Sequence, residues 1–576
     1  MTRSHTLVMT LTLGAVLSLD ATAFAHGGLF RSPQSRGGVG TPSVSSPAAA
    51  RTINGLTPSA RGGVVRAPGA GPEIPFTEDR WEFWWEFNHD ALIDLRPTLN
   101  RQGAAVGGLG FTPVGADEKQ QVVLPVLLRS MRDSNERVRA SACYSLARLG
   151  HTNAVTYLKH AATDDSSLMV RTHAVIALGQ TRSPRAVDTL QSILWDEHRP
   201  DEMRSFAAVS LGMLGTPASS LALREMMGTG EQASLPYTVR LAVVYGLGLT
   251  EDRANAPMLR QFAVRGTDDD RLRALVVLAL GRVGDRAANA VLMDALCDKQ
   301  TQVRRSAAIA LGAVGQPADD QVHQALDQAA NRDPDNMVRN FSDIALGRIA
   351  ARGKVELVDT LCKRMLKETS GRRSFVVLAL GIAGHDKVVP AMLQQFRKES
   401  SHSLAGALAV ALALLDDDKA IPLLRQRFRS TGDPMLRGYL AYALGRLGDT
   451  EVKDELRQQL ETENSPELLR WTAVAMANLS DPKIGEALQS ISGPDREVTT
   501  RSTAAYGLGL VGDRKAIPLL CTMMNRPGEV DLVRAQAVYA LGMLCDQIAE
   551  PTPTAYARDH NYTLNLPFVP ELYFLF

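Results

Sequence analysis

The clearest chemical motif in the sequence is a glycine-rich run, Gly507-Leu508-Gly509-Leu510-Val511-Gly512. It matches the GxGxxG pattern in which a turn between a β-strand and a helix cradles a dinucleotide pyrophosphate. The pattern has that meaning only in that setting, and here the preceding residues have helical periodicity. Residues 443–448 repeat the same arrangement of small residues around a leucine. The run is therefore predicted to belong to a repeat and not to a dinucleotide site.

Two acidic triplets, at residues 268–270 and 416–418, suggest a cation site at first sight. Both fall where turns between helices are expected, so we predict that they cap helices. The sequence contains no P-loop, HExxH, nucleophile-elbow or EF-hand motif. We therefore predict no catalytic residue and no cofactor.

The elements that position these residues come from an internal repeat over residues 117–546. Its centre is a leucine or methionine with Ala, Ser or Gly before it and Gly or Ala after it. The mean period is about 33 residues, the length of a helix pair. The thirteen central residues, here called anchors, are Leu146, Leu178, Leu211, Leu247, Leu280, Leu311, Leu346, Leu380, Leu412, Leu444, Met476, Leu508 and Leu541.

Each period is predicted to form two helices, with the anchor in the second. The Gly after the anchor either ends that helix or lets neighbouring helices approach closely. Pro390, Pro422 and Pro518 follow their anchors by ten residues. That spacing places each of them in the first turn of the next helix, where proline is tolerated.

Charged residues recur in register with the anchors. Seven residues before eleven of the thirteen anchors stands an arginine, and acids recur thirteen residues before several of them; Ala405 and a displaced Arg470 are the two departures. The arginines are Arg139, Arg171, Arg204, Arg240, Arg273, Arg304, Arg339, Arg373, Arg437, Arg501 and Arg534, and the acids are Asp133, Asp165, Asp298, Asp333, Glu399, Glu463 and Asp495. We predict a structural Arg–acid ladder; the alternative is an arginine stripe that binds phosphates or acidic ligands.

This arrangement resembles the HEAT-repeat family, and in particular the short HEAT-like repeats of phycobilisome bilin lyases. The resemblance rests on Val138-Arg139-x-x-Ala142 and on the ALGxLGD motif at residues 443–449. It covers about three quarters of the chain. It implies an all-α, armadillo-type fold, a right-handed α-solenoid of about thirteen helix pairs whose concave face binds proteins.

Some HEAT-like proteins are enzymes. Their deoxyhypusine hydroxylase branch binds iron through His-Glu pairs, but none of the eleven histidines here is followed by Glu. Bilin lyases act inside cells, which does not suit an exported chain. An enzyme or enzyme subunit of the bilin-lyase or hydroxylase-like oxidoreductase branch is therefore the second hypothesis, behind a non-catalytic scaffold.

The N-terminal residues are typical of an export signal. Arg3 precedes an apolar run at residues 7–19, and Ala23-Phe24-Ala25 fits a cleavage site. The run is too short to span a bilayer, so we expect an exported chain, periplasmic or secreted, without a transmembrane segment. Cleavage after Ala25 would expose His26, whose amine and imidazole make it a weak candidate ligand for copper.

Two further segments lie outside the repeat. Trp81, Trp84 and Trp85 share one face of a predicted helix, and the chain ends in an apolar tail. Each is predicted to cap an apolar end of the solenoid or to bind a partner. The predicted parts are therefore a signal peptide (1–25), a Gly/Pro/Ser/Arg-rich linker (26–77), an aromatic capping segment (78–116), the repeats (117–546) and a capping tail (547–576).

The five cysteines lack a CxxC pattern, which argues against a zinc ribbon or c-type haem attachment. Cys521 and Cys545 fall in adjacent repeats, and the sequence leaves open whether they form a disulfide. The 63 basic and 62 acidic residues give a net charge of +1, which argues against a nucleic-acid binder. The prediction is thus an exported, non-catalytic scaffold that binds protein partners along its solenoid surface.

Overall fold

The computed structural model describes residues 79–93, 112–228, 235–265, 269–546, 560–564, 566 and 568. These residues form helices, turns and loops, and none of them lies in a β-strand. The glycine-rich run falls within and at the end of α27 (Val498–Val511), so it belongs to the repeat as predicted. None of the helices in this described part of the chain combines the length and apolar content needed to cross a bilayer.

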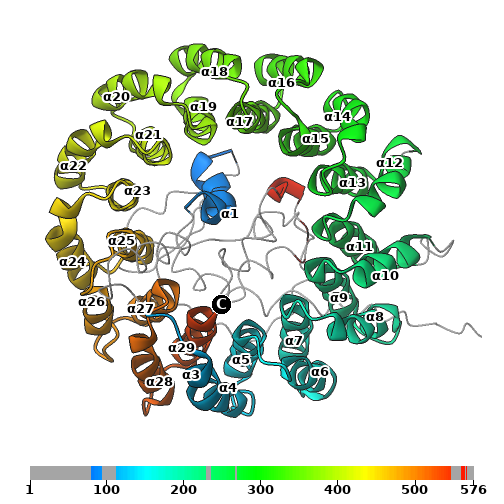
Figure 1. Ribbon diagram of the computed structural model, residues 1–576, viewed down its shortest axis with the longest axis vertical. Coiled ribbons are helices and arrows are strands. Elements are labelled where there is room, and N and C mark those ends of the chain that lie inside the picture. Colours follow the sequence, from blue (N-terminus) through cyan, green and yellow to red (C-terminus); the bar gives the residue numbers. More distant parts are fainter. Residues whose placement is uncertain are drawn as a thin grey trace, which may run out of the picture.

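Within the described residues 112–546, with their two short gaps, thirteen helix pairs follow one another along the chain, which confirms the predicted α-solenoid. The first helix of each pair lies in an outer circle and the second in an inner circle (Figure 1). The pairs are α4 (Leu124–Ser130) and α5 (Glu136–Leu149), α6 (Ala154–Asp164) and α7 (Leu168–Gln180), α8 (Val187–Trp195) and α9 (Asp201–Leu214), α10 (Pro217–Gly228) and α11 (Tyr237–Leu249), α12 (Ala256–Arg265) and α13 (Asp270–Arg282), α14 (Asn289–Leu296) and α15 (Thr301–Val314), α16 (Asp320–Arg332) and α17 (Asn336–Ala351), α18 (Glu356–Lys367) and α19 (Ser370–Ala383), α20 (Val389–Lys398) and α21 (His402–Leu414), α22 (Ile421–Ser430) and α23 (Pro434–Arg446), α24 (Lys453–Thr462) and α25 (Pro466–Asn478), α26 (Ile484–Ser490) and α27, and α28 (Ile517–Asn525) and α29 (Asp531–Cys545).

The small residues beside each anchor let the inner helices pack backbone to backbone. A Cβ atom added to Gly445, which follows its anchor, would lie 2.5 Å from the Cα atom of Ala475 in the next inner helix. Gly281 meets Ala310 in the same way, at 2.6 Å. Since real Cβ atoms do not approach so closely, glycine is required at these positions. The anchors themselves are fully buried between the layers.

The sequence left open whether the glycine after the anchor allows close packing or ends the helix, and the structure assigns these roles to two residues. That glycine allows close packing, whereas the residue three positions later follows the end of the helix. Gly448, for example, has φ +74°, a left-handed conformation that suits glycine. The predicted prolines lie in the first turns of α20, α22 and α28, as expected. The acidic triplets supply caps, because Asp269 and Asp417 accept hydrogen bonds from main-chain N–H groups of their own turns.

The last inner helix packs on the first one, so the array closes into a ring (Figure 1). At this seam Ser145 Oγ in α5 donates a hydrogen bond to the carbonyl oxygen of Val538 in α29, at 2.8 Å. A Cβ atom added to Gly542 would lie 2.4 Å from the Cα atom of Ser145. The seam therefore repeats the contact that joins Gly445 to Ala475 elsewhere.

Closure of the ring differs from the sequence prediction for the ends of the solenoid. The sequence predicts a solenoid with apolar ends that need caps. In the ring, the first and last pairs cover each other. The turn before α3 (Ala116–Glu118) adds to the seam, since the carbonyl oxygen of Thr112 accepts a hydrogen bond from the N–H of Arg514 at 2.8 Å.

A second ladder of charges lies on the turns that lead from one pair to the next. The aspartate of the LGD motif, Asp449, accepts two hydrogen bonds from Arg425 of the preceding outer helix, at 2.7 and 2.8 Å. It also caps a short 3-10 helix by accepting from the N–H of Glu451. In the next turn of this kind, Asp481 accepts one hydrogen bond from Arg457 at 2.8 Å and one from the N–H of Lys483 at 3.0 Å. The motif aspartate thus joins consecutive pairs.

We expect Asp449→Ala to lower the free energy of unfolding by about 1–3 kcal/mol, because it removes a cap and a charge-assisted pair from a buried side chain. The matched control is Asp418→Ala, an exposed acid in the preceding turn of the same kind, which should change it by less than about 0.5 kcal/mol. Urea unfolding followed by circular dichroism measures both. Equal effects of the two substitutions would contradict the assigned role.

Candidate functional site

The predicted arginines take several kinds of partner. Three of them form ion pairs with the predicted acid of the next repeat: Arg139 with Asp165 at 2.9 Å, Arg273 with Asp298 at 3.0 Å, and Arg304 with Asp333 at 2.7 Å. Arg534 in the last repeat pairs with Asp133 in the first, so the series continues across the seam.

The other predicted arginines bind nearer groups. Arg171, Arg339 and Arg373 donate to carbonyl oxygens of their own turns, and Arg204 donates to that of Leu194. Arg240 lies over the ring of Tyr237, Arg437 lies over the ring of Phe428, and Arg501 pairs with Glu529. Asp495 is exposed.

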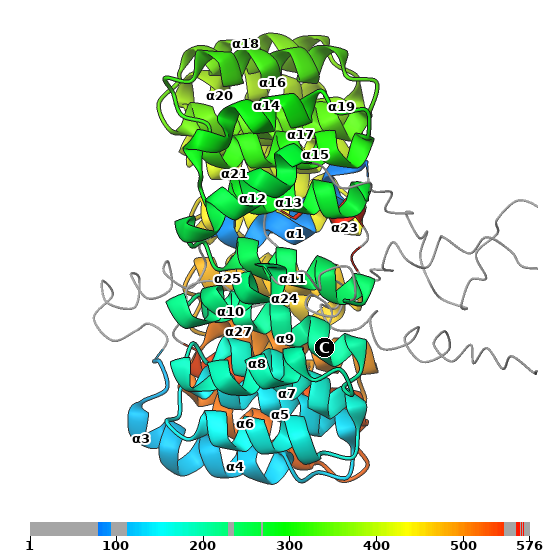
Figure 2. The ribbon, with the colours of Figure 1, turned by 90° about the vertical axis from the view of Figure 1, so that its right-hand side faces the viewer.

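The aromatic segment forms α1 (Trp81–Ile93), which lies inside the ring (Figures 1 and 2). Trp81, Trp84 and Trp85 are all buried, with no more than 4% of each side chain exposed. Trp81 Nε1 donates to the carbonyl oxygen and the Oγ of Ser403 in α21, at 3.0 and 2.9 Å. The Trp85 ring lies 6.2 Å from that of Trp471 in α25. The structure thus places this helix against the inner face of the ring and not over an end repeat.

A buried ion pair fixes α1. Arg470 Nη2 lies 2.7 Å from Glu86 Oε1, and both side chains are less than 10% exposed. Arg446 adds a hydrogen bond at 2.9 Å to the carbonyl oxygen of Ile93, at the end of the helix. Burial alone would lower the pKa of His89, but Asp90, 3.2 Å from Nε2, and the nearby Glu86 raise it above its usual value.

Both departures from the arginine register lie where α1 docks. The displaced Arg470 points at Glu86 and not at the next repeat. Ala405 replaces the arginine in α21, the helix whose Ser403 receives Trp81. The sequence signal for this contact was therefore present, as two exceptions to a periodic rule.

Part of the C-terminal tail also lies inside the ring, against the inner helices α11 to α17. Gln302 in α15 donates to the carbonyl oxygen of Thr563 at 3.0 Å and accepts from Thr563 Oγ1 at 2.7 Å. Asn561 Nδ2 donates to Ser306 Oγ at 3.1 Å. The inner face thus binds a segment that contains a single 3-10 turn, Tyr562–Leu564, through both main-chain and side-chain groups.

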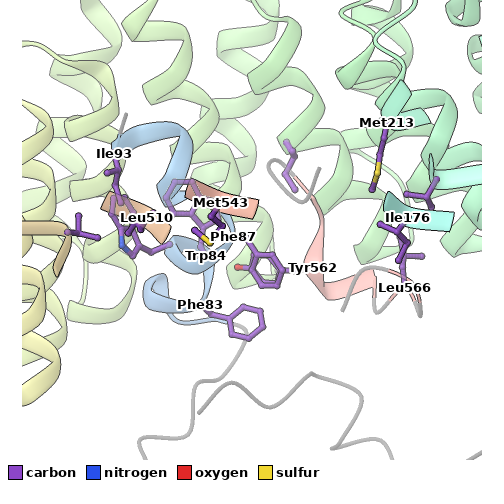
Figure 3. Close-up of a cluster of buried hydrophobic side chains, with 14 of the residues drawn as sticks. Phe83, Trp84, Phe87, Ile93, Ile176, Met213, Leu510, Met543, Tyr562 and Leu566 are labelled. Atoms are coloured by element: carbon purple, nitrogen blue, oxygen red, sulfur yellow. The ribbon is translucent and has the colours of Figure 1, made fainter. Parts of the chain in front are cut away.

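Tyr562 joins the two segments inside the ring (Figure 3). Its ring stacks on Phe87 of α1, with centroids 5.3 Å apart, and meets Phe83 edge-on at 4.9 Å. It also meets Phe341 of α17 edge-on at 5.7 Å. Leu566 lies farther along, on the side of Ile176 in the close-up. Helix α1, the tail and the ring wall therefore share one apolar core.

The remaining candidate residues take no part in this core. His26 lies outside the described residues. No disulfide joins Cys521 to Cys545; Cys545 is buried in α29, and burial raises the pKa of Cys521. Across the described ranges, no three His, Cys, Asp or Glu side chains gather closely enough to hold a metal ion.

Comparison with known proteins gives two kinds of match. A family model for HEAT repeats matches residues 100–178, 163–235, 231–312, 256–346, 389–477 and 421–499. Deoxyhypusine hydroxylase from Danio rerio is 27% identical over 282 residues, which are 44% of this chain and 90% of that protein. The enzyme from Rattus norvegicus is 30% identical over 117 residues, and the match spans 38% of its length.

Two solved structures are also similar. Human deoxyhypusine hydroxylase in complex with glycerol has 20% sequence identity and a TM-score of 0.22, covering 46% of this chain and 98% of that one. The complex of CpcE and CpcF of phycocyanin lyase from a Nostoc species has 20% identity and a TM-score of 0.30, with 46% and 97% covered.

Proposed function

Since this chain belongs to the HEAT-repeat family, with family matches over more than half of its length, we propose that it is an exported, non-catalytic scaffold that binds partner proteins on its ring. One observation carries the proposal. The inner face binds two polypeptide segments that are not repeats, α1 and the tail residues 560–564, 566 and 568, through polar and aromatic contacts. A surface built for polypeptide in this way suits protein binding.

The test is a pull-down from the envelope fraction with the chain beginning at His26 as bait. The same protein should be captured in repeated experiments, and excess untagged chain should compete for it. The endogenous protein should also have His26 as its first residue by N-terminal sequencing. If no protein is captured reproducibly, partner binding is wrong, and an intact Met1 would show that export by this signal is wrong.

An enzymatic function of the hydroxylase-like branch is the second candidate, and the match over 90% of the Danio rerio enzyme favours it. The residues present do not fit the iron site that the resemblance implies. No histidine is followed by Glu, and no metal-binding group occurs among the described residues. Metal analysis of the purified chain decides between the two, because iron bound in stoichiometric amount would contradict a non-catalytic scaffold.

A further inference from the structure

Among the described residues of the tail, His560 is buried inside the ring with one ring nitrogen unsatisfied. The imidazole is 3% exposed, and its Nδ1 atom has no hydrogen-bond partner. It meets the ring of Tyr245 in α11 edge-on at 5.6 Å. The guanidinium of Arg282 in α13 lies over the same tyrosine ring, 4.9 Å from its centroid.

Among the described residues, no acidic side chain lines the pocket that His560 lines. This small pocket is also lined by Arg348 of α17 and by Asn88 and Trp84 of α1. From α15 the pocket receives only Ile309. In the described part of the chain, the charged groups near the imidazole are Arg282, and Arg348, which lines the same pocket; both are positive. A proton on His560 would place a third positive charge in this buried space.

The other described residues of the tail, 561–564, 566 and 568, are uncharged and so form no ion pair with the ring. Their polar contacts are the neutral hydrogen bonds of Asn561 and Thr563 with Gln302 and Ser306. Helix α1, by contrast, is fixed by the buried pair of Glu86 with Arg470. Of the two segments inside the ring, the tail is thus the one that a single charge is able to displace.

We propose that the inner face of α11 to α17 is a binding surface for a peptide segment with the Asn-Tyr-Thr chemistry of residues 561–563, that the tail occupies it at neutral pH, and that protonation of His560 releases the tail to admit such a partner. This proposal rests on the proposed scaffold function and names its site. The partner would supply an aromatic ring for the space between Phe87 and Phe341. It would also supply a main-chain carbonyl and a hydroxyl or amide for Gln302.

The direction of the pH effect follows from linkage. Burial, and then Arg282, lower the pKa of His560 from 6.5 to about 3 in the seated tail. Above pH 6.5 His560 is neutral both in the bound and in the released tail, so pH does not weaken binding of the tail to the inner face. As the pH falls from 6.5 toward 3, only the released tail binds a proton at His560. The equilibrium constant for binding of the tail to the inner face therefore falls about tenfold per pH unit. At pH 5 the expected weakening is about 30-fold.

The experiment measures binding of a fluorescent synthetic peptide, residues 558–570 with glutamine in place of His560, to three full-length chains. The wild type should bind it at least about tenfold more tightly at pH 5.0 than at pH 7.5. His560→Gln removes the titrating group and should show no such gain. His560→Arg carries a permanent charge and should bind the peptide at both pH values. His198→Gln, at an exposed histidine in the turn before α9, is the matched control and should behave as wild type.

Two results would overturn the inference. One is an acid-induced gain in His560→Gln equal to that of the wild type. The other is failure of a folded His560→Arg chain, checked by circular dichroism, to bind the peptide. If His560→Arg does not fold, the comparison of wild type with His560→Gln still decides. If the peptide binds as expected but the pull-down captures no cellular partner, this inference holds and the proposed scaffold function is wrong. Failure of the one is therefore distinguishable from failure of the other.

Discussion

Replacing Gly542 with leucine is expected to open the ring at its seam. The new side chain would start 2.4 Å from the Cα atom of Ser145, and that backbone is unable to move aside without separating α29 from α5. Overpacking of this kind costs about 1–3 kcal/mol or more. No covalent connection holds the seam, so separation relieves the clash. Small-angle X-ray scattering should show a larger radius of gyration.

The matched control is Gly445→Leu, which creates the same clash with Ala475 between neighbours joined by a short turn and an outer helix. That variant should lose stability without the same increase in radius. An unchanged radius for a folded Gly542→Leu chain would show that the seam is not the weakest joint. Equal expansion of both variants would show that any inner interface is able to open.

Replacing Arg470 with alanine is expected to lower the free energy of unfolding by about 3–5 kcal/mol, because it leaves the Glu86 carboxylate buried without its partner. Helix α1 should leave the inner face, and the emission of Trp81, Trp84 and Trp85 should shift to the red as water reaches them. Urea unfolding followed by tryptophan fluorescence measures both effects.

The double variant Glu86→Gln with Arg470→Met separates charge from packing. It removes both charges and should recover most of the lost stability, because no buried charge is left unpaired. Arg429→Ala is the control for a surface pair, because Arg429 and Glu455 are 50% and 36% exposed, and it should cost at most about 1 kcal/mol. A loss as large as that of Arg470→Ala would contradict the special role of the pair with Glu86.

The sequence was sufficient to predict the helix pairs and their number. Close packing of inner helices admits only small residues beside the anchor, as at Gly445 and Ala475, and this requirement leaves a periodic pattern. Closure was not predictable in this way. The rotation between neighbouring pairs depends on small packing differences, and twelve such rotations add up before α29 meets α5. A small change in each step separates a ring from an open superhelix.

The candidate site was predictable only in part. The shared face of Trp81, Trp84 and Trp85 showed that this helix needs a partner surface, but their contacts, such as Ser403 and Trp471, are more than three hundred residues away. Nothing local links such positions. The register shift at Arg470 becomes meaningful only once Glu86 is known to lie opposite it.

The closed seam also changes how the molecule is able to come apart. In an open array of repeats, the terminal repeat has one neighbour, so unfolding starts there and proceeds inward one unit at a time. Here every pair has two neighbours, and no pair is lost first. Freeing any single pair requires two interfaces to break at once, while one broken interface alone leaves all thirteen pairs in place. The ring should therefore resist fraying and proteolysis and lose its structure in one concerted step.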